Sequence, residues 1–210
     1  QLAQQLAQNK PIVLEPVTYE LDTVMLIGGE KKEVTLGNNG YSTEIYGYWR
    51  DSLALGGEIA TKINIRKRNT SLNTLQFRVL ENYSDSLLIR INIYDSKNQY
   101  PAKNLLTQNI YHTVTQRNGV EMVDLSPYRI RVSSDIIVSI ELIKIYGNAL
   151  YFVMAGSLDN GISYRRYVSQ DKWIKHEVGM AMMLDGHYYK YGNRKSDLLR
   201  KQPERITLLW

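Results

Sequence analysis

The 210-residue chain has no cysteine, only three histidines and only two phenylalanines. The absence of cysteine excludes a disulfide scaffold and a thiolate metal site. His112, His176 and His187 are never two or four residues apart, so the close histidine pairs of many metal sites are missing. We therefore expect no catalytic metal and no cofactor.

Long apolar runs and catalytic motifs are also missing. No stretch of ~20 apolar residues predicts a transmembrane helix. The opening "QLAQQLAQNKP" has neither the basic nor the apolar region of an intact signal peptide. No phosphate-binding loop, dinucleotide-binding glycine pattern or serine-hydrolase turn is present. No strand offers two inward-facing Glu residues for glycoside hydrolysis. These absences favour a protein that is not an enzyme, with a glycoside hydrolase as a remote alternative.

The net charge of +5 is concentrated at the C-terminus. From Lys190 onward the chain carries six Lys and Arg residues against two acids, so the preceding part carries only +1. A basic tail on a nearly neutral body argues against nucleic acid as a partner.

What the sequence does have is 16 tyrosines and strict alternation of apolar and polar residues. "LLIRINIY" places Ile89, Ile91 and Ile93 on one face, which is typical of a half-buried strand. "DIIVSIELIKIY" alternates likewise, with a slip before Ile145 that suggests a β-bulge. Turn signals punctuate about ten to twelve such strands between residues 22 and 185. The sequence predicts an all-β, antiparallel, two-sheet β-sandwich, jelly-roll-like.

Three segments give more local predictions. Asn118-Gly119 predicts a hairpin that joins "IYHTVTQ" to "VEMVDL". "GNALYFVMAGS" is apolar on both faces and predicts a central strand. "SYRRYVSQDKWIKH" predicts a hairpin around "SQDK", with its charged and aromatic side chains facing outward.

The predicted domain organisation has three parts. Residues 1–27 are the tail of an upstream domain or a linker strand, and residues 28–185 form the β-sandwich. Residues 186–210 form a basic C-terminal extension, with a short helix that Ser196 caps and Pro203 ends.

The segment from "NTLQFRVLENYSDS" to "IYGNALYFVMAG" resembles a β-sandwich region of exported Bacteroidota proteins. That resemblance rests on a strand ending in "IY", a "P…NLL…NI" run, a "VDLS.Y.I.V" run and an acid-led strand from Asp135. Such proteins often carry an upstream carboxypeptidase regulatory-like domain. The closing strand of that domain would match the residues Val13, Leu14, Pro16, Leu21, Val24 and Leu26.

The resemblance implies an exported protein at the cell surface, the outer membrane or in the periplasm. It implies a non-catalytic binding or scaffolding module of the cell envelope, with a structural or protein-interaction role. Its partner would be another envelope protein or a glycan, with peripheral contact to the outer membrane or to an outer-membrane complex. A carbohydrate-binding module is the alternative.

Exposed aromatic and planar polar side chains supply the candidate ligand-binding residues, which are Tyr46, Tyr48, Trp49, Tyr164, Arg166 and Trp173. The competing interpretation is an aromatic ring packed at a sheet edge with an Arg stacked on it. Candidate partner contacts in the basic tail are Arg194, Lys195, Arg200, Lys201 and Trp210.

Two acidic turns are candidates for structural calcium. One contains Asp95 and Asn98, and the other contains Asp159 and Asn160. The alternative at both is a turn in which the side chain hydrogen-bonds its own backbone.

Overall fold

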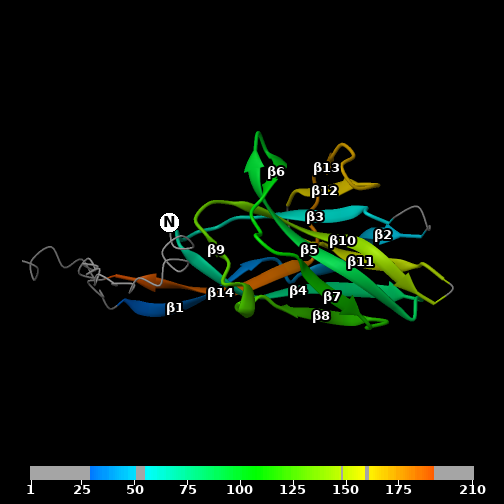
Figure 1. The fold of residues 1–210 in the computed structure, drawn as a ribbon, viewed down its shortest axis with the longest axis horizontal. Helices are drawn as coiled ribbons and strands as arrows, with labels where there is room; N and C mark the ends of the chain where they lie inside the picture. Colours follow the sequence, from blue (N-terminus) through cyan, green and yellow to red (C-terminus); the bar gives the residue numbers. More distant parts are fainter. Residues whose placement is uncertain (1–28, 51–54, 148, 159–160, 192–210) are drawn as a thin grey trace, which may run out of the picture.

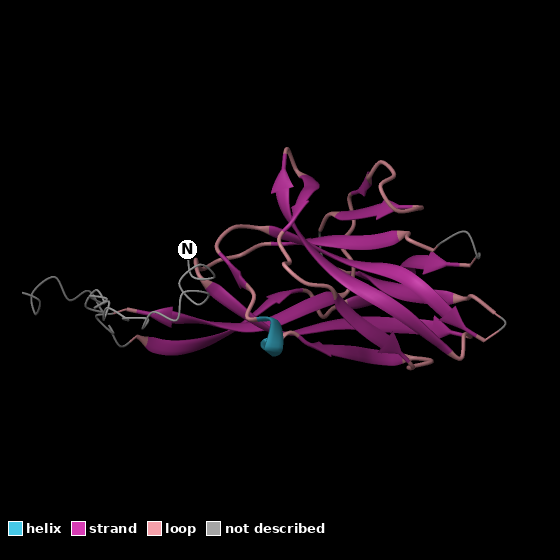
Figure 2. Cartoon of the chain, in the orientation of Figure 1, coloured by secondary structure: helices cyan, strands magenta, loops and turns pink. Residues whose placement is uncertain are grey.

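The computed structural model describes residues 29–50, 55–147, 149–158 and 161–191. Figure 2 shows that the regular secondary structure of this part consists of strands joined by loops, together with one short 3₁₀ turn, Ser126–Tyr128. The strands are β1 (Glu30–Gly37), β2 (Tyr41–Trp49), β3 (Glu58–Ile63), β4 (Thr70–Asn82), β5 (Ser86–Lys97), β6 (Tyr100–Asn104), β7 (Ile110–Val114), β8 (Gly119–Asp124), β9 (Arg131–Val132), β10 (Ile136–Tyr146), β11 (Phe152–Ser157), β12 (Ser163–Arg166), β13 (Ile174–His176) and β14 (Met182–Lys190).

The strands form two antiparallel sheets packed face to face (Figure 1), which confirms the predicted two-sheet sandwich. Sheet A contains the order β1-β14-β4-β11-β2, and β8 and β9 also pair with β4. Sheet B contains the order β13-β12-β3-β10-β5-β6, and β7 also pairs with β5. The orders β2-β11-β4-β8 and β3-β10-β5-β7 within them have the connectivity of an eight-stranded jelly roll.

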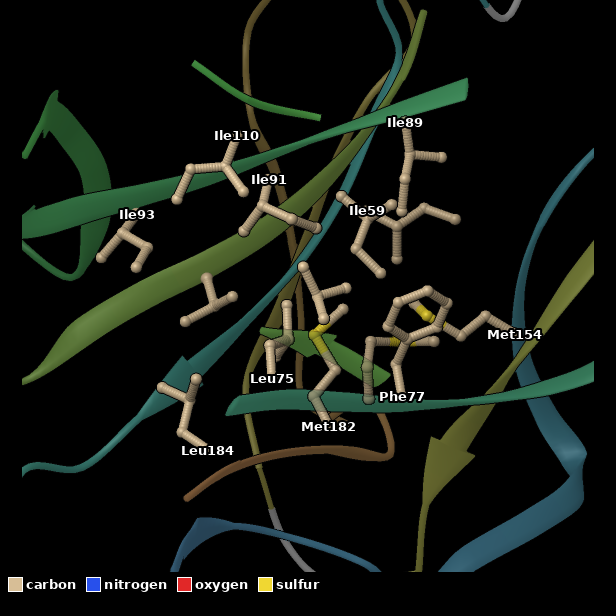
Figure 3. Packing of buried hydrophobic residues seen from close by; sticks show 14 of the residues in the cluster. Ile59, Leu75, Phe77, Ile89, Ile91, Ile93, Ile110, Met154, Met182 and Leu184 are labelled. Carbon is tan, nitrogen blue, oxygen red and sulfur yellow. The ribbon is translucent and has the colours of Figure 1, made fainter. Parts of the chain in front are cut away.

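The core lies between the two sheets and follows directly from the alternation in the sequence. Ile89, Ile91 and Ile93 of β5 are fully buried and point toward sheet A. Figure 3 shows them above Leu75 and Phe77 of β4. Burying each such side chain stabilises the fold by roughly 1.5–3 kcal/mol relative to leaving it exposed.

The slip in β10 is a register irregularity, as predicted. Ile136 to Leu142 pair with β5 in regular register, and the pairing then shifts between Leu142 and Lys144. The shift returns Ile145 to the core side, where it packs against the main cluster. The central-strand prediction for β11 is also confirmed, because all six of its residues are buried between β4 and β2.

The hairpin predicted at Asn118-Gly119 was wrong, because β7 and β8 belong to opposite sheets. The connection instead crosses from sheet B to sheet A at one end of the sandwich. The carboxylate of Glu121 holds this crossing, accepting hydrogen bonds from the backbone N–H groups of Thr115 and Gln116 at 3.0 and 2.9 Å. Because the Glu121 carboxylate accepts these hydrogen bonds, the two backbone N–H groups do not require a paired strand across the turn.

The described chain enters and leaves the sandwich at one end. Glu30 of β1 pairs with Lys190 of β14, and the two strands form a ribbon that extends beyond the sheets (Figure 1). The last strand therefore runs five residues past the expected boundary at 185. Pairing with the charged edge strand β1 accounts for the difference, because "HYYK" has no apolar alternation of its own.

Two hairpins stand on the outer face of sheet B, on the side away from sheet A (Figure 1). One is β5–β6, and the other is the predicted β12–β13 hairpin, in which Ser163 pairs with His176. The hairpins meet where the hydroxyl of Tyr164 donates to the backbone oxygen of Gln99. The rings of Tyr164 and Tyr100 also make contact there. Together the hairpins cover part of a sheet face that would otherwise face solvent.

Candidate binding surface

The structure brings together three of the predicted site residues, Tyr164, Arg166 and Trp173, under the two hairpins. Tyr164 is 1% exposed, and Trp173 is half-buried with its ring edge-on to that of Tyr164, 6.5 Å between centroids. The guanidinium carbon of Arg166 lies 4.7 Å from the centre of the Trp173 ring. This arrangement matches the competing interpretation, in which an Arg is stacked on an aromatic ring packed at a sheet edge. A ring covered by neighbours in its own chain offers little surface to a ligand.

A buried carboxylate explains why Arg166 is held at this position. Glu58 is completely buried, and Arg166 Nε donates to its Oε1 at 3.0 Å. The hydroxyls of Tyr94 and Ser139 donate to the same carboxylate. Burial, followed by the negative charge of Glu58, raises the pKa of Tyr94 well above its usual value. Its hydroxyl therefore stays protonated and continues to donate.

A second buried ion pair lies beside the first. Glu141 of β10 is the direct partner of Glu58 of β3, so both carboxylates lie on the outer face of sheet B. Glu141 Oε2 accepts from Arg90 Nε at 2.8 Å and from Asn92 Nδ2 at 2.9 Å. Two neighbouring carboxylates resemble a glycosidase pair in type, but each is buried against an Arg. The two ion pairs link β3, β5, β10 and β12. A water molecule or a sugar could reach either carboxylate only by displacing its arginine.

The segment "EIYGYWRD" divides between surface and core as alternation predicts. Tyr46 is exposed and Tyr48 is half-buried on the outer face of sheet A, with ring centroids 6.0 Å apart. Trp49 faces the opposite way, is 3% exposed, and stacks on Phe152 at 5.3 Å. Trp49 is thus a core residue that no ligand can reach, because its ring fills space between the sheets.

Four tyrosines and two arginines form a row at the end of the sandwich away from the β1–β14 ribbon. Arg50 lies 4.5 Å from the ring of Tyr48 and 5.2 Å from the ring of Tyr151. Arg165 lies 5.2 Å from the same Tyr48 ring. We call this row the tyrosine–arginine stripe, and its members in spatial order are Tyr83, Tyr151, Arg50, Tyr48, Arg165 and Tyr167.

The two ends of the stripe are its most accessible parts. Tyr83 is 59% exposed and stacks on Tyr151 at 4.9 Å, and Tyr167 is 52% exposed and carries Arg165 at 4.3 Å. The carboxylate of Glu81 raises the pKa of the Tyr83 hydroxyl, so this hydroxyl is a neutral donor at physiological pH.

Sequence reasoning found Tyr48 of the stripe and, in the same segment "EIYGYWRD", Arg50, but it missed the other four members. The missed residues come from the end of β4, the start of β11 and the β12–β13 hairpin. Only Arg50 lies near Tyr48 in the sequence, where "YWR" places it two residues on and on the same face. The remaining members are brought together by the meeting of sheet edges, which leaves no local signal.

A wide polar groove lies between the sheets near the ribbon, with a volume of about 760 Å³. Lys62, Asn64 and Arg66 line one side, while Asn38 and Glu177 contribute elsewhere. Lys62 is paired with Asp135 at 3.1 Å. The groove mixes charges of both signs, so its lining does not favour one ligand chemistry.

Histidines and acids do not form metal clusters in the part of the chain that the structure describes. His112 bonds Glu121 at 2.9 Å between β7 and β8, which ties the two sheets together. His187 lies 3.2 Å from Asn73. At the first calcium candidate turn, Asp95 accepts from the backbone N–H of Lys103, eight residues on in the facing strand β6, so this carboxylate bonds across the β5–β6 hairpin and not to the backbone of its own turn.

Several predicted residues lie outside the described ranges. These are the acidic turn residues Asp159 and Asn160 and the tail residues Arg194, Lys195, Arg200, Lys201 and Trp210. Within the described ranges, no helix has the length and apolarity to span a membrane.

Comparison with known proteins yields no matching family model and no similar curated protein. The function must therefore be argued from the surface itself.

Proposed function

We propose that this protein is a non-catalytic binding module that contacts another protein through the tyrosine–arginine stripe. The observation that carries the proposal is the row itself, in which Arg50 lies between the half-buried Tyr48 and Tyr151, and Arg165 lies between Tyr48 and the exposed Tyr167. Tyr and Arg are enriched in the energetically dominant parts of protein interfaces. Stacking also fixes the long Arg side chains in advance, so less conformational entropy is lost on binding.

The stripe lies at the end of the sandwich opposite the β1–β14 ribbon, a position that is compatible with contact to a partner. β4 has 13 residues, which corresponds to a length of about 40 Å. Its first residues pair near the β1–β14 ribbon, while Tyr83 follows its last residue at the other end. Within the described residues, the β1–β14 ribbon and the stripe therefore lie at opposite ends of the sandwich.

The stacking pattern favours a protein over a glycan as the partner. Sugars bind aromatic side chains through uncovered ring faces. Tyr48 is contacted by two guanidinium groups, and Tyr151 by Arg50 and the Tyr83 ring. The hydroxyls and guanidinium N–H groups of the stripe suit hydrogen bonding to polar side chains and backbone.

The cellular setting is part of the proposal and rests on the resemblance to exported β-sandwich proteins. On that basis the module acts in the cell envelope, at the surface, at the outer membrane or in the periplasm. The absence of catalysis is likewise proposed, and it is supported by the pairing of both Glu58 and Glu141 with arginines.

Site-specific photocrosslinking in the native host tests the proposed interface. A benzoylphenylalanine in place of Tyr167 or Tyr83 is expected to form an adduct with one defined protein. The same probe at Tyr111, which is similarly exposed on β7, is the matched control and is expected to form none.

Second-site changes give the decisive readout. Arg165→Gln and Tyr48→Ala should each reduce the Tyr167 adduct at least fivefold, and thermal unfolding verifies that both variants are folded at the assay temperature. Equal yields of the crosslinked adduct from probes at Tyr111 and Tyr167 would show that the stripe is not the interface. The carbohydrate-binding alternative would be supported by two results together. The protein would bind a glycan array in a way that Tyr48→Ala abolishes, and the photocrosslinking probes would form no protein adduct.

A further inference from the structure

Two positive charges of the stripe converge on one ring. The guanidinium carbons of Arg50 and Arg165 lie 4.5 and 5.2 Å from the centre of the Tyr48 ring, so they are at most about 10 Å apart. Among the described residues, no carboxylate lies within the 4.0 Å ion-pair distance of either group. By contrast, Arg90 and Arg166 on the neighbouring sheet each have a glutamate.

Two neighbouring cations that have no counter-charge among the described residues favour the binding of an anion. Like charges at this separation repel each other, and a bound carboxylate removes that repulsion. The planar guanidinium group also binds a carboxylate through two parallel hydrogen bonds. Among the described residues, Arg50 Nη2 makes a long contact of 3.5 Å with the Tyr151 hydroxyl.

The strand beneath these cations is an edge of sheet A. In the described part of the chain, β2 pairs on one side with β11 and has no neighbour on the other. Exposed edges are commonly protected by charged side chains or proline. The opposite edge strand β1 follows that rule, because its first four residues are "EKKE". β2 reads "YSTEIYGYW" and carries a single charge, Glu44, so its edge lacks this protection.

We propose that the partner presents an extended acidic segment, which pairs with the free edge of β2 and places alternate carboxylates on Arg50 and Arg165. Residues two apart in a strand are separated by about 7 Å and lie on the same face. That spacing is compatible with two guanidinium groups at most about 10 Å apart. Backbone pairing supplies affinity and the two arginines supply the preference for acidic side chains. This inference rests on the proposed function and deepens it.

Fluorescence anisotropy with two labelled peptides tests the preference directly. One peptide alternates Thr and Glu over seven residues, and the other replaces each Glu with Gln. The 210-residue protein should bind the Glu peptide at least tenfold more tightly than the Gln peptide. Raising the salt concentration from 50 to 500 mM should weaken the Glu peptide's binding severalfold, because exposed charges are screened.

Charge variants identify the residues responsible. Arg50→Gln and Arg165→Gln should each weaken binding of the Glu peptide at least fivefold. Arg131→Gln removes the same charge from an exposed position on β9 and should leave binding unchanged. Equal binding of the two peptides, or an equal loss in the Arg131→Gln variant, would overturn the inference. Unchanged melting temperatures verify that the variants are folded.

Amide hydrogen exchange tests the strand addition. Saturating Glu peptide should slow exchange of outward-facing β2 amides, while β1 amides remain unchanged. If the peptide binds but the amide exchange rates of β2 do not change, the proposed pairing with β2 is wrong. Binding of oligogalacturonate but not of the Glu peptide would assign the arginines to an acidic glycan and overturn the acidic-segment proposal. Photocrosslinking that succeeds while both peptides fail would leave the protein interface standing and reject only the acidic segment.

Discussion

Arg166 and Glu58, 108 residues apart in the chain, form a buried ion pair that joins β12 to β3. Arg166 Nε donates to Glu58 Oε1 at 3.0 Å, and the guanidinium carbon lies 4.7 Å from the centre of the Trp173 ring. The pair therefore fixes the β12–β13 hairpin on sheet B. Arg165, which immediately precedes Arg166, reaches the stripe from the other face of the same strand. The buried pair thus positions one of the two arginines of the proposed binding surface.

Removing the charge of Glu58 should destabilise the protein strongly. Glu58→Gln leaves Arg166 as a buried cation without a counter-charge, which typically costs about 3–5 kcal/mol. Urea unfolding followed by circular dichroism measures the free energy of unfolding. Lys175→Gln removes one partner of an ion pair whose other member, Glu177, is largely exposed, and should change stability by no more than about 0.5 kcal/mol. A loss below about 1 kcal/mol for Glu58→Gln would contradict the structural role of the pair.

The raised pKa of Tyr94 predicts a specific loss of stability at alkaline pH. Below about pH 10, the ordinary pKa of tyrosine, the hydroxyl is protonated in both states and its contribution is complete. Above that pH the unfolded chain loses this proton while folded Tyr94 keeps it, so stability falls as pH rises. The slope for one such group is at most about 1.4 kcal/mol per pH unit.

Comparison with Tyr94→Phe isolates this effect. The variant lacks the titration, and near pH 8 it should be less stable by about 1 kcal/mol, because it loses the hydrogen bond to Glu58. That difference should shrink as the pH is raised from 9 to 11 in urea unfolding experiments. Tyr111→Phe, on an exposed part of β7, should parallel the wild type. A constant difference between wild type and Tyr94→Phe would contradict the raised pKa.

The irregularity in β14 should not tolerate a side chain at Gly186. The register with β4 shifts between Asp185 and Gly186, and a Cβ at Gly186 would lie 2.2 Å from the backbone oxygen of Ser71. Gly186→Ala should cost about 1–3 kcal/mol, because backbone must move to relieve the clash. At Gly179 the nearest atom to an added Cβ is 3.4 Å away, so Gly179→Ala is the control that should be tolerated. Equal melting temperatures for the two variants would contradict this difference.

The two described tryptophans should differ in their effect on stability. Trp49→Ala empties space in the main core beside Phe152 and should cost about 3–5 kcal/mol. Trp173→Ala should cost less, since Trp173 is only half-buried at the edge of the smaller cluster under the hairpins. Urea unfolding of both variants measures the difference. A larger loss for Trp173→Ala would reverse the assignment of the two rings to core and edge.

Alternation predicted several details correctly because it is a local property. The three isoleucines of β5 point inward, Tyr46 and Tyr48 share a face, and Trp49 points the other way. The slip in β10 was equally visible, since an extra residue breaks period two at the position where it is inserted.

Sheet membership could not be predicted in the same way. "TQRNGV" has the composition of a tight hairpin, yet β7 pairs with β5 and β8 pairs with β4. Turn composition favours a chain reversal, but it does not specify whether the following strand returns to the same sheet or crosses to the other. The anchoring of this crossing by Glu121 depends on where its carboxylate ends up in three dimensions.

The sequence by itself determined that this protein is a two-sheet β-sandwich and which side chains of most strands face inward, because period-two patterning acts over a few residues. Tertiary structure alone decided which charges and rings meet. Glu58 pairs with Arg166, 108 residues away in the chain, and the Tyr48 ring contacts both Arg50 and Arg165. These contacts form because the order of the strands brings the edges of the two sheets together. The proposed function depends on this second kind of information, since the surface that carries it is assembled from four separate parts of the chain.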